Sequence, residues 1–123
     1  MELIAIQTDI QWHSPAANCR VVDEWLRQMS PEPGALVVLP EMFASGFSRD
    51  TAAATEGWAE TEGQLSRFAS RYSIALMAGV ANGRTGCSAN ESVTFGPDGR
   101  ELARYRKLHP FSLAGETEAY PAG

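Results

Sequence analysis

The 123 residues have the length of one domain and the composition of an ordinary globular chain, with 44% hydrophobic and 20% charged residues. The formal net charge of −5 argues against a nucleic-acid-binding protein, which normally presents a basic face. The sequence lacks an apolar run of ~18 residues and the basic and apolar regions of a signal peptide, so we expect neither a membrane span nor a leader. Two cysteines, Cys19 and Cys87, do not make a disulfide framework, which favours a cytoplasmic protein.

The basic residues are unevenly divided, because nine of the ten are arginine and Lys107 is the one lysine. A chain that uses arginine for its other cations did not acquire this lysine for surface charge alone. Lys107 is therefore a candidate for a chemical role, with a solvated surface cation as the alternative.

The first forty residues predict a strand, a helix and a second strand. Leu3–Ile6 is a short apolar run typical of a strand covered on both faces. Ser14 and Pro15 form a helix-start pair, and apolar residues then recur at spacings of three and four as far as Met29. The run 35–39, bounded by glycine and proline, indicates a buried strand. This order and spacing predict a βαβ-like unit with two parallel strands.

The rest of the chain predicts a more mixed pattern. After the second strand we expect a loop with a short helical piece over residues 41–61. A helix over residues 61–72 and a third buried strand over residues 74–80 follow it. Strands at 91–95 and 102–106 form a hairpin, since the Gly-Pro-Asp-Gly sequence between them is turn chemistry. From Lys107 onward the prolines and glycines predict a loop, so the last seventeen residues are expected to have no regular structure.

Glu41 lies just beyond a buried strand, at the kind of position where α/β proteins place their functional sites. A carboxylate at the edge of an apolar core is partly desolvated and can act as a base near neutral pH. The alternatives are a solvated loop glutamate or a charge at a helix N-terminus. Lys107, at the end of the hairpin, could hold an oxyanion or move protons beside such a carboxylate.

The other reactive side chains give weaker signals. Cys19 falls within the first helix, and Cys87 falls in a loop with no base near it in the sequence. His13 and His109 lie too far from the cysteines for a zinc site. The triplet 90–92 fits the glycosylation acceptor pattern, which an intracellular chain would not use.

Several of these segments together resemble the nitrilase, or carbon–nitrogen hydrolase, superfamily. They are residues 39–43 (LPEMF), 97–99 (PDG) and 105–109 (YRKLH). Residues 40–47 (PEMFASGF) and 111–116 (FSLAGE) look most like the omega-amidase branch. The resemblance covers essentially all 123 residues, and it is the combination of segments that makes it specific.

The resemblance implies an α/β fold, part of an αββα four-layer sandwich that is incomplete at the C-terminus. It also implies a Glu–Lys–Cys triad. Glu41 matches the general base and Lys107 the lysine that stabilises the oxyanion. Glu116 is similar to the second glutamate, which orients the lysine and the substrate, with Glu118 as the less favoured candidate. The implied substrate is a small monoamide of a dicarboxylic or 2-oxo-dicarboxylic acid. Nothing in the sequence implies a cofactor or a metal. The resemblance also implies that full-length relatives are homodimers.

The sequence departs from the family at the nucleophile. The family's cysteine follows the second glutamate, whereas Cys19 and Cys87 both precede Lys107. We therefore expect residues 1–123 to be the N-terminal portion of one hydrolase domain, inactive alone, with exposed apolar sheet edges. The alternatives are a non-catalytic remnant or binding module that keeps the half-fold, and an independent cysteine enzyme that uses Cys87.

Overall fold

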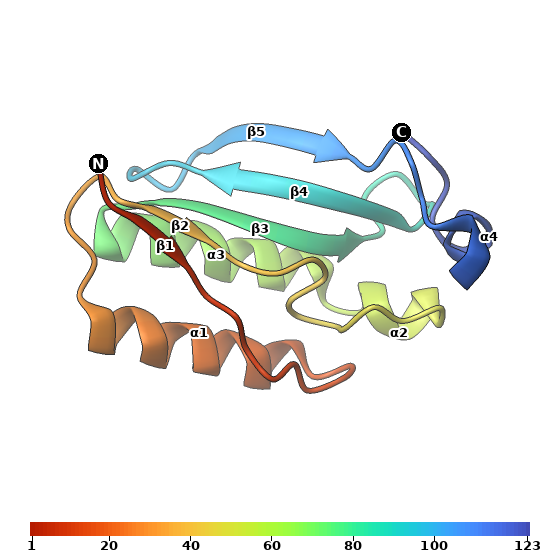
Figure 1. Cartoon of the computed structure of the whole chain (residues 1–123), viewed down its shortest axis with the longest axis horizontal. Helices are drawn as coiled ribbons and strands as arrows, with labels where there is room; N and C mark the ends of the chain where they lie inside the picture. The colour runs from red at the N-terminus through yellow and green to blue at the C-terminus, as the bar shows by residue number, and fades with distance from the viewer.

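The structure, a computed structural model, describes the backbone of all 123 residues and the side chains of all of them except Ala114. Five strands form one mixed sheet in the order β1-β2-β3-β4-β5, and the long helices α1 and α3 lie against one face of it (Figure 1). The strands are β1 (Leu3–Ala5), β2 (Leu36–Val38), β3 (Ala75–Asn82), β4 (Ala89–Phe95) and β5 (Glu101–Arg106). The helices are α1 (Pro15–Met29), α2 (Thr51–Thr55), α3 (Trp58–Tyr72), the 3₁₀ turn η1 (Ser112–Ala114) and α4 (Glu116–Ala119). No helix in the described part of the chain is long and apolar enough to cross a membrane.

The predicted βαβ unit is confirmed. β1 pairs with β2 in parallel, and β2 pairs with β3 in parallel. Helix α1 begins at Pro15, as the Ser-Pro pair predicts, and ends where Ser30 takes the left-handed conformation and donates its N–H to Leu26 O. Helix α3 begins at Trp58, three residues before the predicted start, because Gly57 takes the left-handed conformation and serves as the N-cap of α3.

The core lies between the sheet and the two long helices. Its largest members are fully buried, so each contributes roughly 1.5–3 kcal/mol relative to an exposed position. They include Leu26 of α1, Leu65 of α3 and Val37, Leu76 and Val93 of the sheet. This packing fixes strands β2, β3 and β4 against the two long helices.

The predicted hairpin of β4 and β5 is also confirmed. The two strands pair antiparallel, and the turn between them is closed by the Gly96 N–H, which donates to Arg100 O at 2.8 Å. Strand β4 begins at Ala89, two residues before the predicted start at Glu91. The difference matters for function, because it places Asn90 inside the sheet.

The prediction that residues 107–123 form only loop is wrong. They contain the 3₁₀ turn η1 and the one-turn helix α4. Gly115 takes the left-handed conformation that separates these elements, and Glu116 and Glu118 lie in the first turn of α4. Tyr120 then anchors the segment, because its ring is buried and its hydroxyl donates to Ser48 O at 2.7 Å. These elements are too short to show a helical period in the sequence.

The sheet face opposite α1 and α3 carries no helix (Figure 1). Strand alternation directs Leu3, Met77 and Tyr105 to this face, and these residues are 65%, 38% and 54% exposed. Strands β1 and β5 are the outermost strands, so each pairs with one neighbour within the sheet. We refer to this surface as the open face.

Candidate active site

The predicted site residues meet at one edge of the sheet. Glu41 lies three residues beyond β2, and Lys107 directly follows β5. Because β4 runs antiparallel to both β3 and β5, the ends of β2, β3 and β5 point to the same edge. Helix α4 packs beside that edge and begins at Glu116 (Figure 1). Asn90, near the start of β4, reaches the same place from the open face.

Lys107 joins the two glutamates. Its Nζ donates to Glu41 Oε1 at 2.8 Å and to Glu116 Oε2 at 3.0 Å. Asn90 joins them a second time, because its Nδ2 lies 2.7 Å from Glu41 Oε1 and 2.7 Å from Glu116 Oε1. The result is a closed ring of four side chains in which each carboxylate accepts hydrogen bonds from both donors.

Glu116 is the buried member of this ring, with no exposed surface. Burial raises the pKa of its carboxyl group. Hydrogen bonds from the Phe111 N–H, Asn90 and Lys107 outweigh that effect, so the pKa lies below its usual range. Glu116 is therefore a carboxylate at neutral pH, and its place between two donors fixes where the ammonium group of Lys107 can lie.

The side chain of Lys107 is an ammonium group held in place by the carboxylates of Glu41 and Glu116. Burial lowers the pKa of its side chain, but the hydrogen bonds to Glu41 and Glu116 outweigh burial and raise the pKa above its usual value. Its Nζ also lies 5.6 Å from the centre of the Phe47 ring, within the range of a cation–π contact. Lys107 can therefore supply positive charge to a developing oxyanion, and it is not a base at neutral pH.

Glu41 is held by its backbone and left accessible at its carboxylate. Gly79 packs against it so closely that a Cβ on residue 79 would lie 2.5 Å from Glu41 Cα. The next residue, Met42, takes the left-handed conformation with φ of 48°, which turns the chain away from the sheet. The hydrogen bonds to the Glu41 carboxylate from the described residues all reach Oε1, and the side chain is 49% exposed. Oε2 is thus free to accept a proton.

A hollow of ≈ 230 Å³ adjoins Glu41 and Lys107 on the open face, lined in part by Met77, Ser92 and Tyr105. It has apolar walls next to a charged pair, as a small polar substrate requires. Among the residues that the structure describes, no group of three or more His, Cys, Asp or Glu side chains could hold a metal ion.

The two cysteines lie elsewhere. Cys19 is buried in α1, where burial raises the pKa of its thiol to about 11. Cys87 is exposed in the loop between β3 and β4, and it lines a hollow with residues of α2. Neither lines the hollow beside Glu41 and Lys107. Glu118 is also outside the ring, because its side chain is 79% exposed and pairs with Arg49.

The structure brings together Glu41, Lys107 and Glu116, which are candidates from the sequence, and adds Asn90, which is not. In the sequence, Asn90 is noticeable only as part of a glycosylation acceptor triplet, whereas in the structure it is 4% exposed and holds both glutamates. A weak signal did exist. A buried amide on a strand next to a predicted carboxylate site must satisfy its hydrogen bonds there.

Comparison with known proteins shows which family this chain is related to. The model of the carbon-nitrogen hydrolase family matches residues 4–123. The omega-amidase YafV of Yersinia enterocolitica is 31% identical over 123 residues, which is 100% of this chain and 47% of that protein. Human omega-amidase is 33% identical over 94 residues, covering 72% of this chain and 33% of that protein. A deaminated glutathione amidase of Synechocystis is 35% identical over 106 residues, covering 78% of this chain and 38% of that protein.

Solved structures show the same fold. A CN-hydrolase superfamily protein of Xanthomonas campestris, with an arsenic adduct in its active site, matches with a TM-score of 0.88 at 29% identity. That match covers 98% of this chain and 45% of the other. An amidase from Nesterenkonia matches with a TM-score of 0.87 at 23% identity, over 100% of this chain and 48% of the other. The chain spans about half the length of the curated relatives it matches, and it belongs to the carbon–nitrogen hydrolase family.

Proposed function

We propose that these residues serve the hydrolysis of a small linear amide, with Glu41 as the general base, Lys107 as the oxyanion-stabilising cation and Glu116 as the residue that orients Lys107. The observation that carries this proposal is the position of Lys107 between the two carboxylates, at 2.8 and 3.0 Å. A solvated surface lysine, the alternative left open by the sequence, does not donate to two carboxylates of which one is fully buried.

The proposed reaction uses a cysteine thiol that neither Cys19 nor Cys87 supplies at this site. Glu41 Oε2 accepts the thiol proton, and the thiolate attacks the amide carbon. The carbonyl oxygen becomes an oxyanion beside the ammonium of Lys107. The C–N bond then breaks, and the proton held by Glu41 passes to the leaving nitrogen, which departs as ammonia. Water, deprotonated by Glu41, attacks the resulting thioester and releases the carboxylic acid and the thiol.

The names of the relatives support a choice of substrate class. Several are omega-amidases, so we propose a monoamide of a dicarboxylic or 2-oxo-dicarboxylic acid. Structures of variants of the Nesterenkonia amidase contain acrylamide and butyramide, which are also small linear amides. The hollow of ≈ 230 Å³ beside Glu41 and Lys107 is in keeping with a substrate of that size.

The position of the cysteines supports a second candidate, a half-domain that binds small amides without cleaving them. Two assays of ammonia release separate the candidates. The 123-residue chain alone should release no ammonia from dicarboxylic acid monoamides, whereas the product of the complete gene should release it steadily. A complete product that binds the amide and leaves it intact would establish the binding module instead.

A Lys107→Ala variant of the complete gene product tests the assigned roles. It should lose roughly 10²–10³-fold in turnover, since it removes the charge that faces the oxyanion. Glu118→Gln is the matched control, because Glu118 belongs to the same helix as Glu116 and is outside the ring. Near-normal turnover of Lys107→Ala, or a comparable loss in Glu118→Gln, would contradict the assignment.

A further inference from the structure

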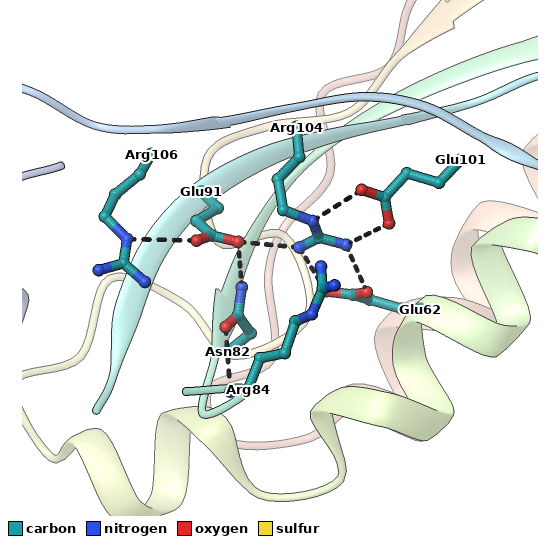
Figure 2. Close-up of polar contacts among 7 residues, drawn as sticks. All are labelled: Glu62, Asn82, Arg84, Glu91, Glu101, Arg104 and Arg106. Atoms are coloured by element: carbon teal, nitrogen blue, oxygen red, sulfur yellow. Dashed lines mark hydrogen bonds and ion pairs between the residues drawn. The ribbon is translucent and has the colours of Figure 1, made fainter. Parts of the chain in front are cut away.

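A second charged cluster lies behind the site, on the helix-facing side of β4 and β5. We call it the Glu91 cluster, and Figure 2 shows it converging on Glu91 and Arg104. Arg104 pairs with Glu91 at 2.8 Å, with Glu62 of α3 at 2.7 Å and with Glu101 at 2.8 Å. On its other side Glu91 accepts from Arg106 at 3.2 Å and from the Asn82 amide.

The centre of the cluster is largely buried. The side chains of Glu91, Glu62 and Arg104 are only 7%, 12% and 14% exposed. Burial raises the pKa of Glu91, but hydrogen bonds from Arg104, Asn82 and Arg106 outweigh it and lower the pKa, so Glu91 is ionised at neutral pH. Removing one partner from such an arrangement leaves an uncompensated charge, which is strongly destabilising.

Strand alternation connects this cluster to the site. Asn90 and Glu91 are neighbours on β4, so one side chain reaches the open face and the other the helix-facing side. Arg106 and Lys107 are divided in the same way, because Arg106 binds Glu91 while Lys107 binds Glu41 and Glu116. The backbone links the two pairs: the Lys107 N–H donates to Asn90 O at 3.0 Å.

We propose that Glu91 is a positioning residue for the site. Its ion pairs with Arg104 and Arg106, on the helix-facing side of the sheet, fix the register of β4 and β5 where these strands carry Asn90 and lead into Lys107. Glu91 and Arg106 face each other directly in that register. The proposal rests on the proposed function only in taking Lys107 as a site residue.

Glu91 is distinguished from the other acids of the cluster by its two arginine partners. Glu62 and Glu101 pair only with Arg104 among the described residues, and neither touches the end of β5. Glu91 pairs with both Arg104 and Arg106, at the strand position next to Asn90. A change at Glu101 therefore removes a charge from the same cluster and leaves the Glu91–Arg106 contact in place.

The single lysine makes the test direct. In the 123-residue chain grown with ¹³C,¹⁵N-lysine, Lys107 provides the only labelled backbone amide and the only labelled side chain. NMR then follows two properties of one residue: hydrogen exchange of the Lys107 amide, which reports its bond to Asn90 O, and titration of the Lys107 ammonium group, which reports its contacts with Glu41 and Glu116. Neither readout requires catalysis, so failure of this inference is distinct from failure of the proposed function.

Glu91→Gln keeps the size of the side chain and removes its charge. We expect exchange of the Lys107 amide to accelerate roughly tenfold or more. We also expect the ammonium pKa to fall toward its ordinary value. Glu101→Gln should leave both properties unchanged. Val22→Ala, in the core on α1, should lower global stability and leave the ammonium pKa unchanged.

The outcomes separate cleanly. An unchanged Lys107 pKa in Glu91→Gln would mean that Glu91 is merely structural, which overturns the proposal. A lower pKa with unchanged amide exchange would mean that Glu91 acts only through its charge, which also overturns it. If Glu91→Gln fails to fold, Arg106→Gln takes its place, since it removes the same cross-strand contact and leaves Glu91 paired with Arg104 and Asn82. It must then show both changes for the proposal to stand.

Discussion

Gly79 of β3 lies directly against the backbone of Glu41. The Gly79 N–H donates to Pro40 O at 3.2 Å, and Gly79 O accepts from the Phe43 N–H at 3.1 Å, so the turn that carries Glu41 is bonded to β3 on both sides of the glutamate. No side chain fits between them, because a Cβ on Gly79 would lie 2.5 Å from Glu41 Cα. The glycine thus sets how near the backbone of Glu41 can come to β3.

Gly79→Ala should push the Glu41 turn away from the sheet. Overpacking of this kind costs about 1–3 kcal/mol, which chemical denaturation of the 123-residue chain would measure. Gly63→Ala is the control, because Gly63 lies within α3 with room for a methyl group and should gain up to about 1 kcal/mol. Equal stability of Gly79→Ala and the wild-type chain would show that the contact is not tight.

Asn90→Asp replaces the amide that bridges two carboxylates with a third carboxylate. We expect the free energy of unfolding at neutral pH to fall by about 2–3 kcal/mol, since two hydrogen bonds to charged groups are lost and like charges meet. The deficit should shrink as the pH falls and the carboxylates protonate. Urea unfolding across this pH range measures it, and a deficit independent of pH would contradict the bridging role.

Glu116 should stabilise the folded chain at neutral pH and stop doing so in acid. Its pKa lies below the usual 4.5 in the folded state, so its contribution is present above the unfolded-state pKa and disappears as the pH falls through the folded value. Glu116→Gln should therefore lower stability at neutral pH, with the gap to wild type closing below about pH 4.5. The exposed Glu118→Gln should stay near wild type throughout. A Glu116→Gln gap that widens in acid would reverse the assigned sign.

Tyr120 holds helix α4, and thus Glu116, in place. Tyr120→Phe removes the donor to Ser48 O from a buried position and should cost about 1–3 kcal/mol by thermal or urea unfolding. Tyr105→Phe is the matched control, because Tyr105 is 54% exposed and should change stability by no more than about 0.5 kcal/mol. Equal effects of the two variants would mean that Tyr120 does not anchor the helix.

The sequence predicted those parts of the molecule that depend on neighbouring residues. The Ser14-Pro15 start of α1 and the Gly-Pro-Asp-Gly turn are local signals, and both elements formed as expected. Glu41 is a candidate because of its place after a buried strand, and Lys107 because of its isolation among arginines. Glu116 becomes a candidate only through the family resemblance, since nothing local marks it.

What could not be predicted depends on contacts between distant residues. Asn90 gains its role from glutamates 49 and 26 residues away, and no periodic pattern reports such a meeting. Glu91 looks like an ordinary charged strand residue until β5 and α3 bring arginines and another glutamate around it. Helix α4 has only four residues, too few for a hydrophobic period.

Glu41 is proposed as the base of an amide-hydrolysing site, and turnover of Glu41→Gln in the complete gene product tests that role most directly. The variant keeps the size of the side chain and can still lie beside Lys107, so the protein should fold. Ammonia release from a dicarboxylic acid monoamide should fall roughly 10²–10⁴-fold, because no group remains to accept the thiol proton. Turnover within a few-fold of wild type would contradict the claim.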